Sequence, residues 1–278
     1  MNIGPFKKYI KEPNDICYGS IYTYEVSLPI FYYKERIVRL YLPIDYDENK
    51  SYPLLVMADG QNIVDKYTSA YGAWEIDKRQ HELIKEGYPS FIVLGIDCPV
   101  GVKERALEYS FPFMKMNKKE EGKELNKADL KFESHLLFRY IVETLIPLVK
   151  KYVKISEIAS GGSSMGGVFS LAVLTSYPEV FSTALSFSPA YFLYNKKTLD
   201  EYMDKKITKI DKNHKFFFYV GGVGFESKFV NRCILMNNYL VNKGYNTKLV
   251  IDESGEHNEA TWSSHFNEAI RYWLRKDK

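Results

Sequence analysis

The sequence predicts an α/β fold in which a mixed, mostly parallel sheet carries helices on both faces. Short continuous apolar runs, Leu54–Ala58 and Phe91–Ile96, are typical of strands buried on both sides. A helical spacing of apolar residues lies between them at 74–86, and this alternation of strand and helix favours parallel strands. The earlier segments 21–31 and 36–42 are rich in β-branched and aromatic residues and suit antiparallel pairing. We therefore expect a mixed sheet.

The rest of the chain continues this alternation without a repeat or a linker, so we expect one domain over residues 1–278. The spacing at 132–152 predicts an amphipathic helix, which Pro147 must kink or break because proline lacks the helical N–H donor. The charged stretch 112–131 is expected to be a lid or a solvated loop. The other expected strands are 155–159, 183–187, 215–220 and 248–251, and the other expected helices are 168–175, 230–243 and 259–275.

Composition excludes several classes of function. The net charge is +3 and the basic residues are interspersed with acidic ones, which argues against a nucleic-acid surface. The three cysteines form neither a disulfide framework nor a metal pattern, and no cofactor is expected. No run approaches the ~20 apolar residues that cross a bilayer, and the N-terminus lacks the apolar core of a secretory signal. We expect a cytoplasmic protein with no membrane partner, and the oligomeric state stays open.

Residues 162–166 (GSSMG) match the pattern G-x-S-x-G between an expected strand and an expected helix. In the α/β-hydrolase fold this pattern forms a sharp turn that presents a nucleophilic serine, here Ser164. Side chains two residues before and after it would collide, so both positions are glycine. The alternative is a glycine-rich turn with an N-capping serine. Ser163 is a weaker candidate because its frame ends at Met165 rather than at glycine.

A nucleophilic serine needs a general base. The chain order in this fold is nucleophile, acid, histidine, so the base should follow the last strand. His257 is in that position, between the strand 248–251 and the C-terminal helix. The other four histidines lie on expected helices or before a strand, where packing or surface roles are expected: His81, His135, His214 and His265.

The acid should lie in the loop after the strand 215–220. Glu226 is the only carboxylate in that loop, residues 221–226, where it would hold the tautomer of His257. Asp252, close to His257 in sequence, is the alternative acid. A structural role for Glu226, near the N-terminus of the next helix, is compatible with the catalytic one.

An oxyanion hole requires two backbone N–H donors. One is expected from Met165, which follows the nucleophile, and the other from the loop after the strand 54–58. Gln61 is the preferred donor in that loop and Gly60 is the next candidate, because glycine lets the backbone approach the substrate closely.

Several segments together resemble the putative esterase family, which includes enterochelin-type siderophore esterases, feruloyl and acetyl xylan esterases, S-formylglutathione hydrolases and mycolyltransferases. The segments fall between residues 37 and 274: MADGQN, WEID at 74–77, GID at 95–97, Arg105 with Glu108-Tyr109, GGSSMGG, YVGGVGFE and GEHNEATW. The resemblance implies an α/β-hydrolase with Ser164, Glu226 and His257 as its triad. The length and charge of 112–131 depart from the family pattern.

The sequence thus predicts a serine esterase acting on a small, carbohydrate-linked or siderophore-type ester. An acyltransferase with the same triad and a non-catalytic binding protein on a hydrolase scaffold are the alternatives. Trp74, Tyr109, Tyr191 and nearby aromatic residues can stack on a sugar or an aromatic acyl group. Arg105 can bind a substrate carboxylate or pair with Glu108.

Overall fold

The computed structural model describes residues 3–10, 16–30, 34–69, 71–114 and 133–275. The strands in these ranges form one sheet of nine, in the order β1-β2-β3-β5-β4-β6-β7-β8-β9. Their bounds are β1 Lys7–Tyr9, β2 Gly19–Ser27, β3 Glu35–Pro43, β4 Ser51–Ala58, β5 Ile92–Ile96, β6 Lys154–Ser163, β7 Thr183–Phe187, β8 Lys215–Gly221 and β9 Asn246–Asp252.

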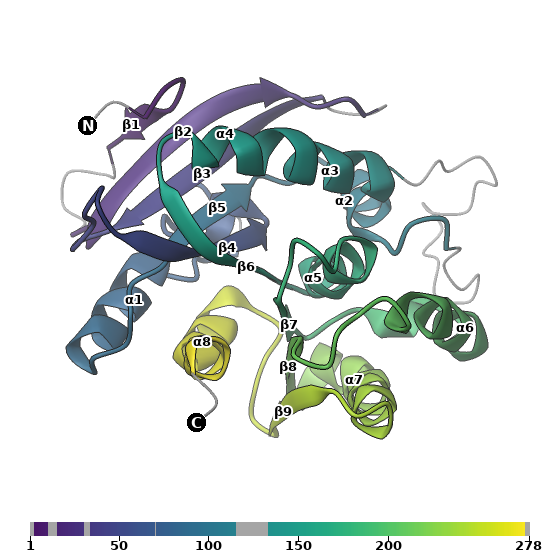
Figure 1. Cartoon of the computed structure of the whole chain (residues 1–278). Coiled ribbons are helices and arrows are strands. Elements are labelled where there is room, and N and C mark those ends of the chain that lie inside the picture. The colour runs from purple at the N-terminus through teal and green to yellow at the C-terminus, as the bar shows by residue number, and fades with distance from the viewer. Residues whose placement is uncertain (1–2, 11–15, 31–33, 70, 115–132, 276–278) are drawn as a thin grey trace.

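The first three strands and β5 pair antiparallel, whereas β5, β4 and β6 to β9 are all parallel. Figure 1 shows α1 and α8 on one side of the sheet and α3 to α7 on the other. The mixed sheet between two helical layers confirms the predicted α/β-hydrolase fold. The helices are α1 Ile76–Lys85, α2 Val102–Tyr109, α3 Ser134–Tyr140, α4 Ile146–Lys150, α5 Met165–Ser176, α6 Lys196–Ile207, α7 Ser227–Asn242 and α8 Glu259–Leu274.

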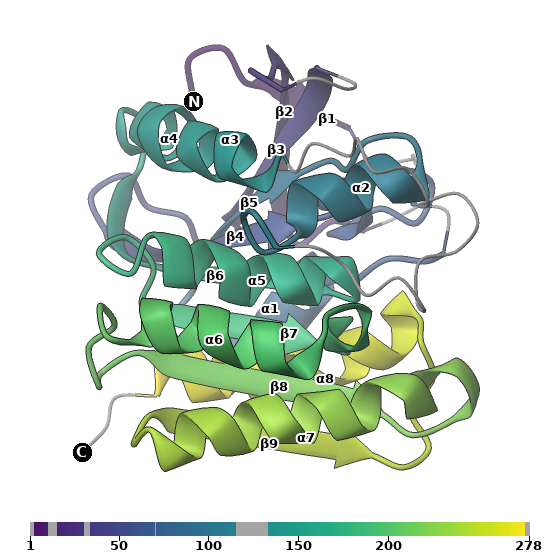
Figure 2. The ribbon, with the colours of Figure 1, turned by 90° about the vertical axis from the view of Figure 1, so that its right-hand side faces the viewer.

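Strand β4 shows why the central strands are apolar throughout. Leu54 and Val56 pack into the core on one face of the sheet, and Leu55 and Met57 pack into the core on the other. Since helices cover both faces, successive side chains are buried on opposite sides. Because these strands are parallel, the carboxyl ends of β4, β6, β7, β8 and β9 lie at the same edge of the sheet. Figure 2 shows the strands lying side by side.

The predicted helix over 132–152 is interrupted, as Pro147 requires. A π-helical turn, Ile141–Leu145, separates α3 from α4, and Pro147 lies in the first turn of α4. The proline cannot donate to a carbonyl one turn earlier, so the preceding turn widens to a different hydrogen-bond spacing.

Four elements differ from the sequence predictions. The predicted strand 155–159 extends to Ser163, because pairing with β4 and β7 overrides the weak strand preference of its glycines. The strand β1 and the helices α2 and α6 were not predicted. Helix α6 is mostly polar, yet Leu199, Met203 and Ile207 recur every four residues on its buried face. Of the predicted lid or loop at 112–131, residues 115–131 lie outside the described part of the chain.

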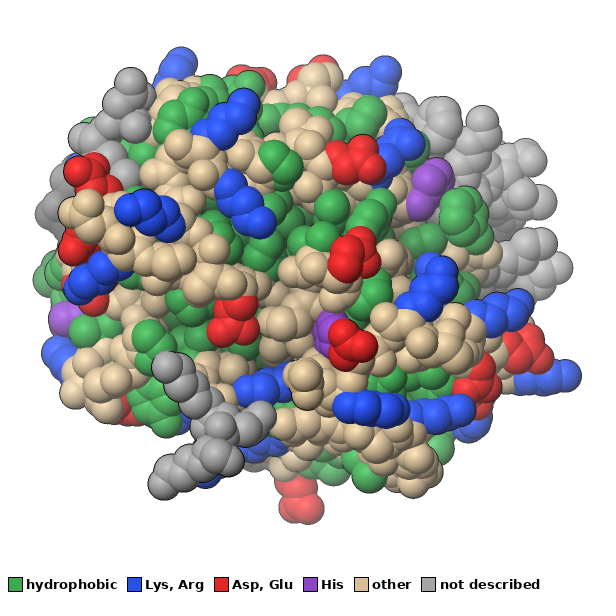
Figure 3. Space-filling view, viewed as in Figure 1, with side chains coloured by type: hydrophobic (Ala, Val, Ile, Leu, Met, Phe, Trp, Pro, Cys, Tyr) green, Lys and Arg blue, Asp and Glu red, His purple; other side chains and the backbone are tan. Residues whose placement is uncertain are grey.

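The surface agrees with the dispersed charge of the sequence. On the face seen in Figure 3, Lys and Arg side chains are interspersed with Asp and Glu. Within the described residues, none of the helices has both the length and the apolar character that a membrane crossing requires.

Candidate active site

Ser164 lies at the turn between β6 and α5 with φ 57° and ψ −116°, a left-handed conformation that is uncommon for serine. A Cβ atom on Gly162 would lie 2.7 Å from the carbonyl oxygen of Gly166. A Cβ on Gly166 would lie 3.1 Å from the side chains of Ala58 and Asp59. Gly162 is therefore required by its collision with Gly166, as predicted, whereas Gly166 is required by the close approach of the loop after β4.

The two candidate serines differ in burial and in position. Ser163 is the last residue of β6 and is buried, whereas Ser164 is half-buried and precedes the first turn of α5. The Ser164 hydroxyl is thus carried at a helix N-terminus, where the dipole favours negative charge. Its backbone N–H donates to the carbonyl of Phe187 at 2.9 Å, which ties the turn to the end of β7.

Glycines bring the loops after β8 and β9 into contact. A Cβ on Gly221 would lie 2.4 Å from the carbonyl oxygen of Gly255, so no larger residue fits at that crossing. The N–H of Val223 donates to the same carbonyl at 3.2 Å. This crossing places Glu226 beside His257, whose Nδ1 lies 3.0 Å from Glu226 Oε1.

Glu226 is fully buried, and its carboxylate does not cap α7 although it precedes that helix. It accepts a second hydrogen bond, 2.6 Å long, from the hydroxyl of Ser188. That hydroxyl accepts in turn from the indole N–H of Trp262 at 2.9 Å. The carboxylate therefore has its hydrogen bonds inside the protein and is turned toward His257.

The alternative acid, Asp252, has other partners. Its Oδ2 lies 3.2 Å from Nε2 of His265 and accepts from the hydroxyl of Tyr219 at 3.2 Å. Hydrogen bonds from Ser254 hold the pKa of Asp252 below its usual value. Glu226, and not Asp252, is thus the carboxylate that contacts His257 in the described structure.

The other histidines occupy packing positions, as the sequence analysis expected. His81 stacks on Tyr18 and His135 lies against Phe113. Both ring nitrogens of His214 lie within hydrogen-bond distance of backbone carbonyls.

Three aromatic rings surround the imidazole of His257. The ring centroids of Phe229, Trp262 and Phe225 lie 4.6, 4.9 and 5.2 Å from it. Among the described residues, no hydrogen bond joins Ser164 to His257. Such bonds are often long before a substrate is bound. The Nδ1 contact with Glu226 leaves Nε2 as the nitrogen that can accept a proton.

The loop after β4 lies next to the turn of Ser164, because β4 and β6 are parallel neighbours in the sheet. Gly60 is required there, since a Cβ would lie 2.7 Å from the backbone of β5. The side-chain carbonyl of Gln61 accepts from the N–H of Cys98 at 3.0 Å, and its amide donates to Sγ at 3.1 Å. Burial raises the pKa of the Cys98 thiol to about 12, so this partner stays neutral. The backbone at Gln61 is therefore held in place.

The predicted pairing of Arg105 with Glu108 is wrong. Arg105 instead forms two hydrogen bonds of 2.7 Å with the carboxylate of Asp59. It also donates to the carbonyl of Ser163 at 3.3 Å. Arg105 thus connects the loop around Gly60 to the turn of Ser164, and its charge is matched within the protein. Glu108 is buried beside Arg36 instead.

The predicted aromatic contacts also need correction. Of the rings expected to stack on a substrate, Phe192 is half-buried and the other four are fully buried. Trp74 packs among Phe187, Trp262 and Phe266, and Tyr109, Tyr191 and Tyr194 lie in the core on the other face of the sheet. Loop position suggested exposure for these residues, but their bulk fills the space between loops and helices. The hydroxyl of Tyr109 accepts from the N–H of Asp59 at 3.0 Å, a supporting contact.

Two residues of the site were missed by sequence reasoning. Phe225 is 52% exposed and stands edge-on to His257. Its position directly before Glu226 was a usable signal. Ser188 contacts Glu226 from a loop 38 residues earlier, and nothing in the sequence marks that contact.

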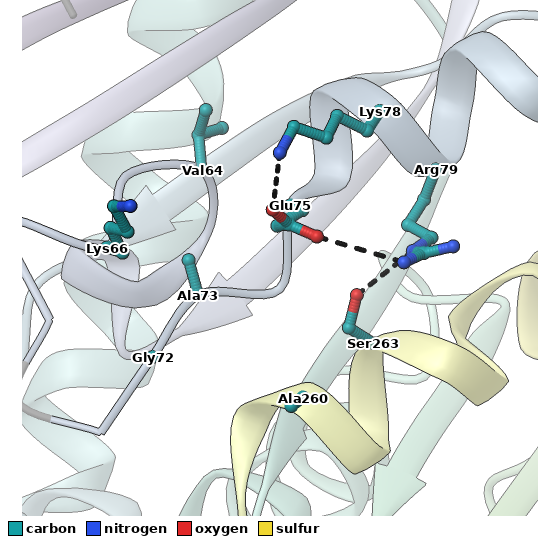
Figure 4. A pocket seen from close by; sticks show the side chains of 9 residues that line it. All are labelled: Val64, Lys66, Gly72, Ala73, Glu75, Lys78, Arg79, Ala260 and Ser263. Atoms are coloured by element: carbon teal, nitrogen blue, oxygen red, sulfur yellow. Dashed lines mark hydrogen bonds and ion pairs between the residues drawn. The ribbon is translucent and has the colours of Figure 1, made fainter. Parts of the chain in front are cut away.

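A cavity of about 350 Å³ lies between the start of α1 and the start of α8 (Figure 4). Its charges are largely matched by internal contacts: Glu75 pairs with Lys78 and Arg79, and Arg79 also donates to Ser263. No residue predicted for the site lines it. The remaining lining residues are Val64, Lys66, Gly72, Ala73 and Ala260.

The fold, with a strained serine turn and a Glu–His pair at one edge of the sheet, defines an α/β-hydrolase. A family model described as Putative esterase matches residues 33–272. The chain therefore belongs to the putative esterase family, which places it among the esterases and confirms the resemblance that its motifs suggested.

Solved structures share this fold. The BES protein from Bacillus cereus has a TM-score of 0.71 and 18% identity, covering 96% of this chain and 99% of its own. A siderophore hydrolase, EstA from Aspergillus nidulans, has a TM-score of 0.67 and 15% identity, covering 96% and 97%. A ferulic acid esterase has a TM-score of 0.65 and 14% identity, covering 94% and 99%. No curated protein matches the chain in sequence.

Proposed function

We propose that the protein is a serine esterase that hydrolyses carboxylic esters through an acyl-enzyme on Ser164. One observation carries the proposal: a buried carboxylate, Glu226, lies 3.0 Å from Nδ1 of His257, at the sheet edge that carries the strained turn of Ser164. A histidine held in this way presents Nε2 as a general base. The three residues also follow the chain order of α/β-hydrolases.

In the first half of the reaction, the Ser164 oxygen attacks the ester carbonyl carbon and its proton passes to His257 Nε2. The Nδ1 proton stays hydrogen-bonded to Glu226, whose charge stabilises the imidazolium. His257 then gives its proton to the leaving alcohol, and the acyl group remains on Ser164. In the second half, His257 takes a proton from water as the water oxygen attacks the acyl carbon. The imidazolium then returns that proton to the Ser164 oxygen, and the acid is released.

The oxyanion of each tetrahedral intermediate is assigned to the backbone N–H groups of Met165 and Gln61, with Gly60 as the next candidate. Met165 is the first residue of α5, where N–H groups have no partner within the helix. Gln61 lies on the neighbouring loop and is fixed by its bonds to Cys98. Donors held in this way need no reorganisation when charge develops.

The substrate is proposed to be a small ester of the carbohydrate-linked or siderophore type. Phe225 offers a half-exposed aromatic face beside His257, where an apolar or aromatic part of an ester can rest. Structures with the same fold include a siderophore hydrolase and a ferulic acid esterase, which supports this choice.

The nucleophile is tested with p-nitrophenyl acetate and with a serine-reactive phosphonate. Replacing Ser164 by alanine should lower kcat by a factor of about 10⁶, because the covalent step is lost. Mass spectrometry should find one phosphonate per wild-type chain, on Ser164, and none on the variant.

The matched control is Ser163→Ala, which removes the neighbouring hydroxyl and should keep both turnover and labelling. Full activity in Ser164→Ala, or a label on any other residue, would contradict the proposed nucleophile.

A further inference from the structure

Ser188 is a strained, fully buried residue outside the proposed triad. It follows β7 directly and has φ 41°, a backbone conformation that disfavours any residue but glycine. Such strain persists only where the surroundings hold it, and it is often found at functional sites. The reason for a serine at this position must therefore come from its hydroxyl.

The contacts of that hydroxyl fix its direction. The indole nitrogen of Trp262 can only donate, so Ser188 accepts from it at 2.9 Å. The hydroxyl proton is then left for Glu226 Oε1, 2.6 Å away. The same oxygen receives the hydrogen bond from His257 Nδ1, whereas Oε2 of Glu226 has no partner among the described atoms. Both hydrogen bonds that fix this carboxylate thus meet at one oxygen.

The backbone of Ser188 adds a second anchor. Its N–H donates to the carbonyl of Tyr219 at 2.7 Å, on β8, the strand that leads into the loop of Glu226. Ser188 therefore connects the end of β7, the end of β8 and, through Trp262, helix α8. These segments all border the site but contact one another across 38 and 74 residues of sequence.

We propose that Ser188 is the positioning residue of Glu226. Together with Trp262 it holds the carboxylate oxygen at the imidazole, so that His257 keeps the tautomer and orientation needed as a base. The inference rests on the proposed function, since it assigns Ser188 a role only if Glu226 and His257 act in catalysis.

Two substitutions separate the hydroxyl from the backbone strain. Ser188→Ala removes the hydroxyl and keeps the strain, whereas Ser188→Gly removes the hydroxyl and relieves it. Both should lower kcat roughly 10- to 100-fold. This is the loss seen when a metal-binding histidine loses the group that hydrogen-bonds its other ring nitrogen. KM for p-nitrophenyl acetate should change less than about twofold, because the substrate is not touched. The Tm of Ser188→Gly should not fall below that of Ser188→Ala.

A double-mutant cycle tests whether Ser188 acts through Glu226. Once Glu226 is alanine, adding Ser188→Ala should lower kcat less than about twofold further. The Glu226→Ala background stays measurable, because loss of a triad acid costs about 100-fold less than loss of the nucleophile. The matched control is Ser186→Ala, a buried serine of β7 that bonds Ser170, and it should keep the wild-type kcat.

Three outcomes would overturn the inference. One is wild-type kcat in Ser188→Gly, another is an equal loss of kcat in both backgrounds of the cycle, and the third is a rise in KM alone. In each case Ser164→Ala and Glu226→Ala must still lose activity, so that the proposed function stands. If those two variants keep wild-type kcat, the proposed function itself fails.

Discussion

The loops on the two sides of Ser164 are held by different kinds of interaction. After β8 and β9, Glu226 and His257 meet among aromatic rings, and the described residues include no Lys or Arg partner for Glu226. After β4 and β5, ion pairs with at least one buried partner fix the backbone: Arg105 with Asp59 and Arg39 with Asp97.

The difference has a chemical meaning. In the proposed mechanism, a cation next to His257 would weaken the field that stabilises the imidazolium, and Glu226 is held instead by the neutral hydroxyl of Ser188. In the same proposal, the loop around Gly60 has to position backbone N–H groups, and charges there can be neutralised locally. Bidentate arginine pairs suit that task because their geometry is rigid. Three substitutions, in decreasing order of expected effect, test this contrast.

The largest effect is expected on the uncharged side. Glu226→Gln keeps the shape of the side chain but removes the charge that holds His257, and kcat for p-nitrophenyl acetate should fall about 10⁴-fold. Asp252→Asn is the matched control, because Asp252 contacts His265 instead, and it should change kcat less than about twofold. The reverse result would make Asp252 the acid.

On the charged side, Arg105→Ala leaves the buried carboxylate of Asp59 without its partner. The free energy of unfolding should fall by about 3 kcal/mol in urea denaturation, the scale of a broken buried pair. Activity should also fall, because the loop that carries Gln61 loses its tie to the Ser163 carbonyl. Arg271→Ala breaks the exposed pair with Glu86 and should cost less than about 1 kcal/mol. Equal losses in the two variants would contradict the contrast.

A smaller, pH-dependent effect is expected at Glu108. Burial raises the pKa of its carboxyl to about 8, even though Arg36 lowers it, and Glu133 and Asp59 add to the rise. The folded protein therefore keeps a proton that the unfolded chain releases near pH 4.5. The stability gained is complete below that pH and is lost as the pH rises toward 8.

Glu108→Gln cannot release a proton, so its Tm should fall less than that of the wild type between pH 5 and about 8. Differential scanning calorimetry at several pH values measures this. Parallel Tm curves for the two proteins would show that Glu108 does not titrate in this range.

Patterns local in sequence predicted most of the framework. The apolar runs of β4, β5, β7 and β8 predicted buried strands, and Pro147 predicted the interruption between α3 and α4. Prediction failed where tertiary pairing overrides local preference, as in the glycine-rich end of β6. It also failed for the rings of Trp74 and Tyr191, since position in a loop does not reveal burial.

By itself, the sequence predicted the turn of Ser164, because the collision that demands glycine at 162 is with residue 166, four positions along the chain. The contact that demands glycine at 166 comes from Ala58 and Asp59 and was decided by the tertiary structure. Chain order also made His257 the predicted base. The tertiary structure decided which carboxylate contacts that base, which partner holds Arg105, and that Ser188 touches Glu226. Those contacts join loops that are adjacent only because β7, β8 and β9 pair in parallel. No local stretch of sequence predicts this strand order, because it depends on pairing between distant segments.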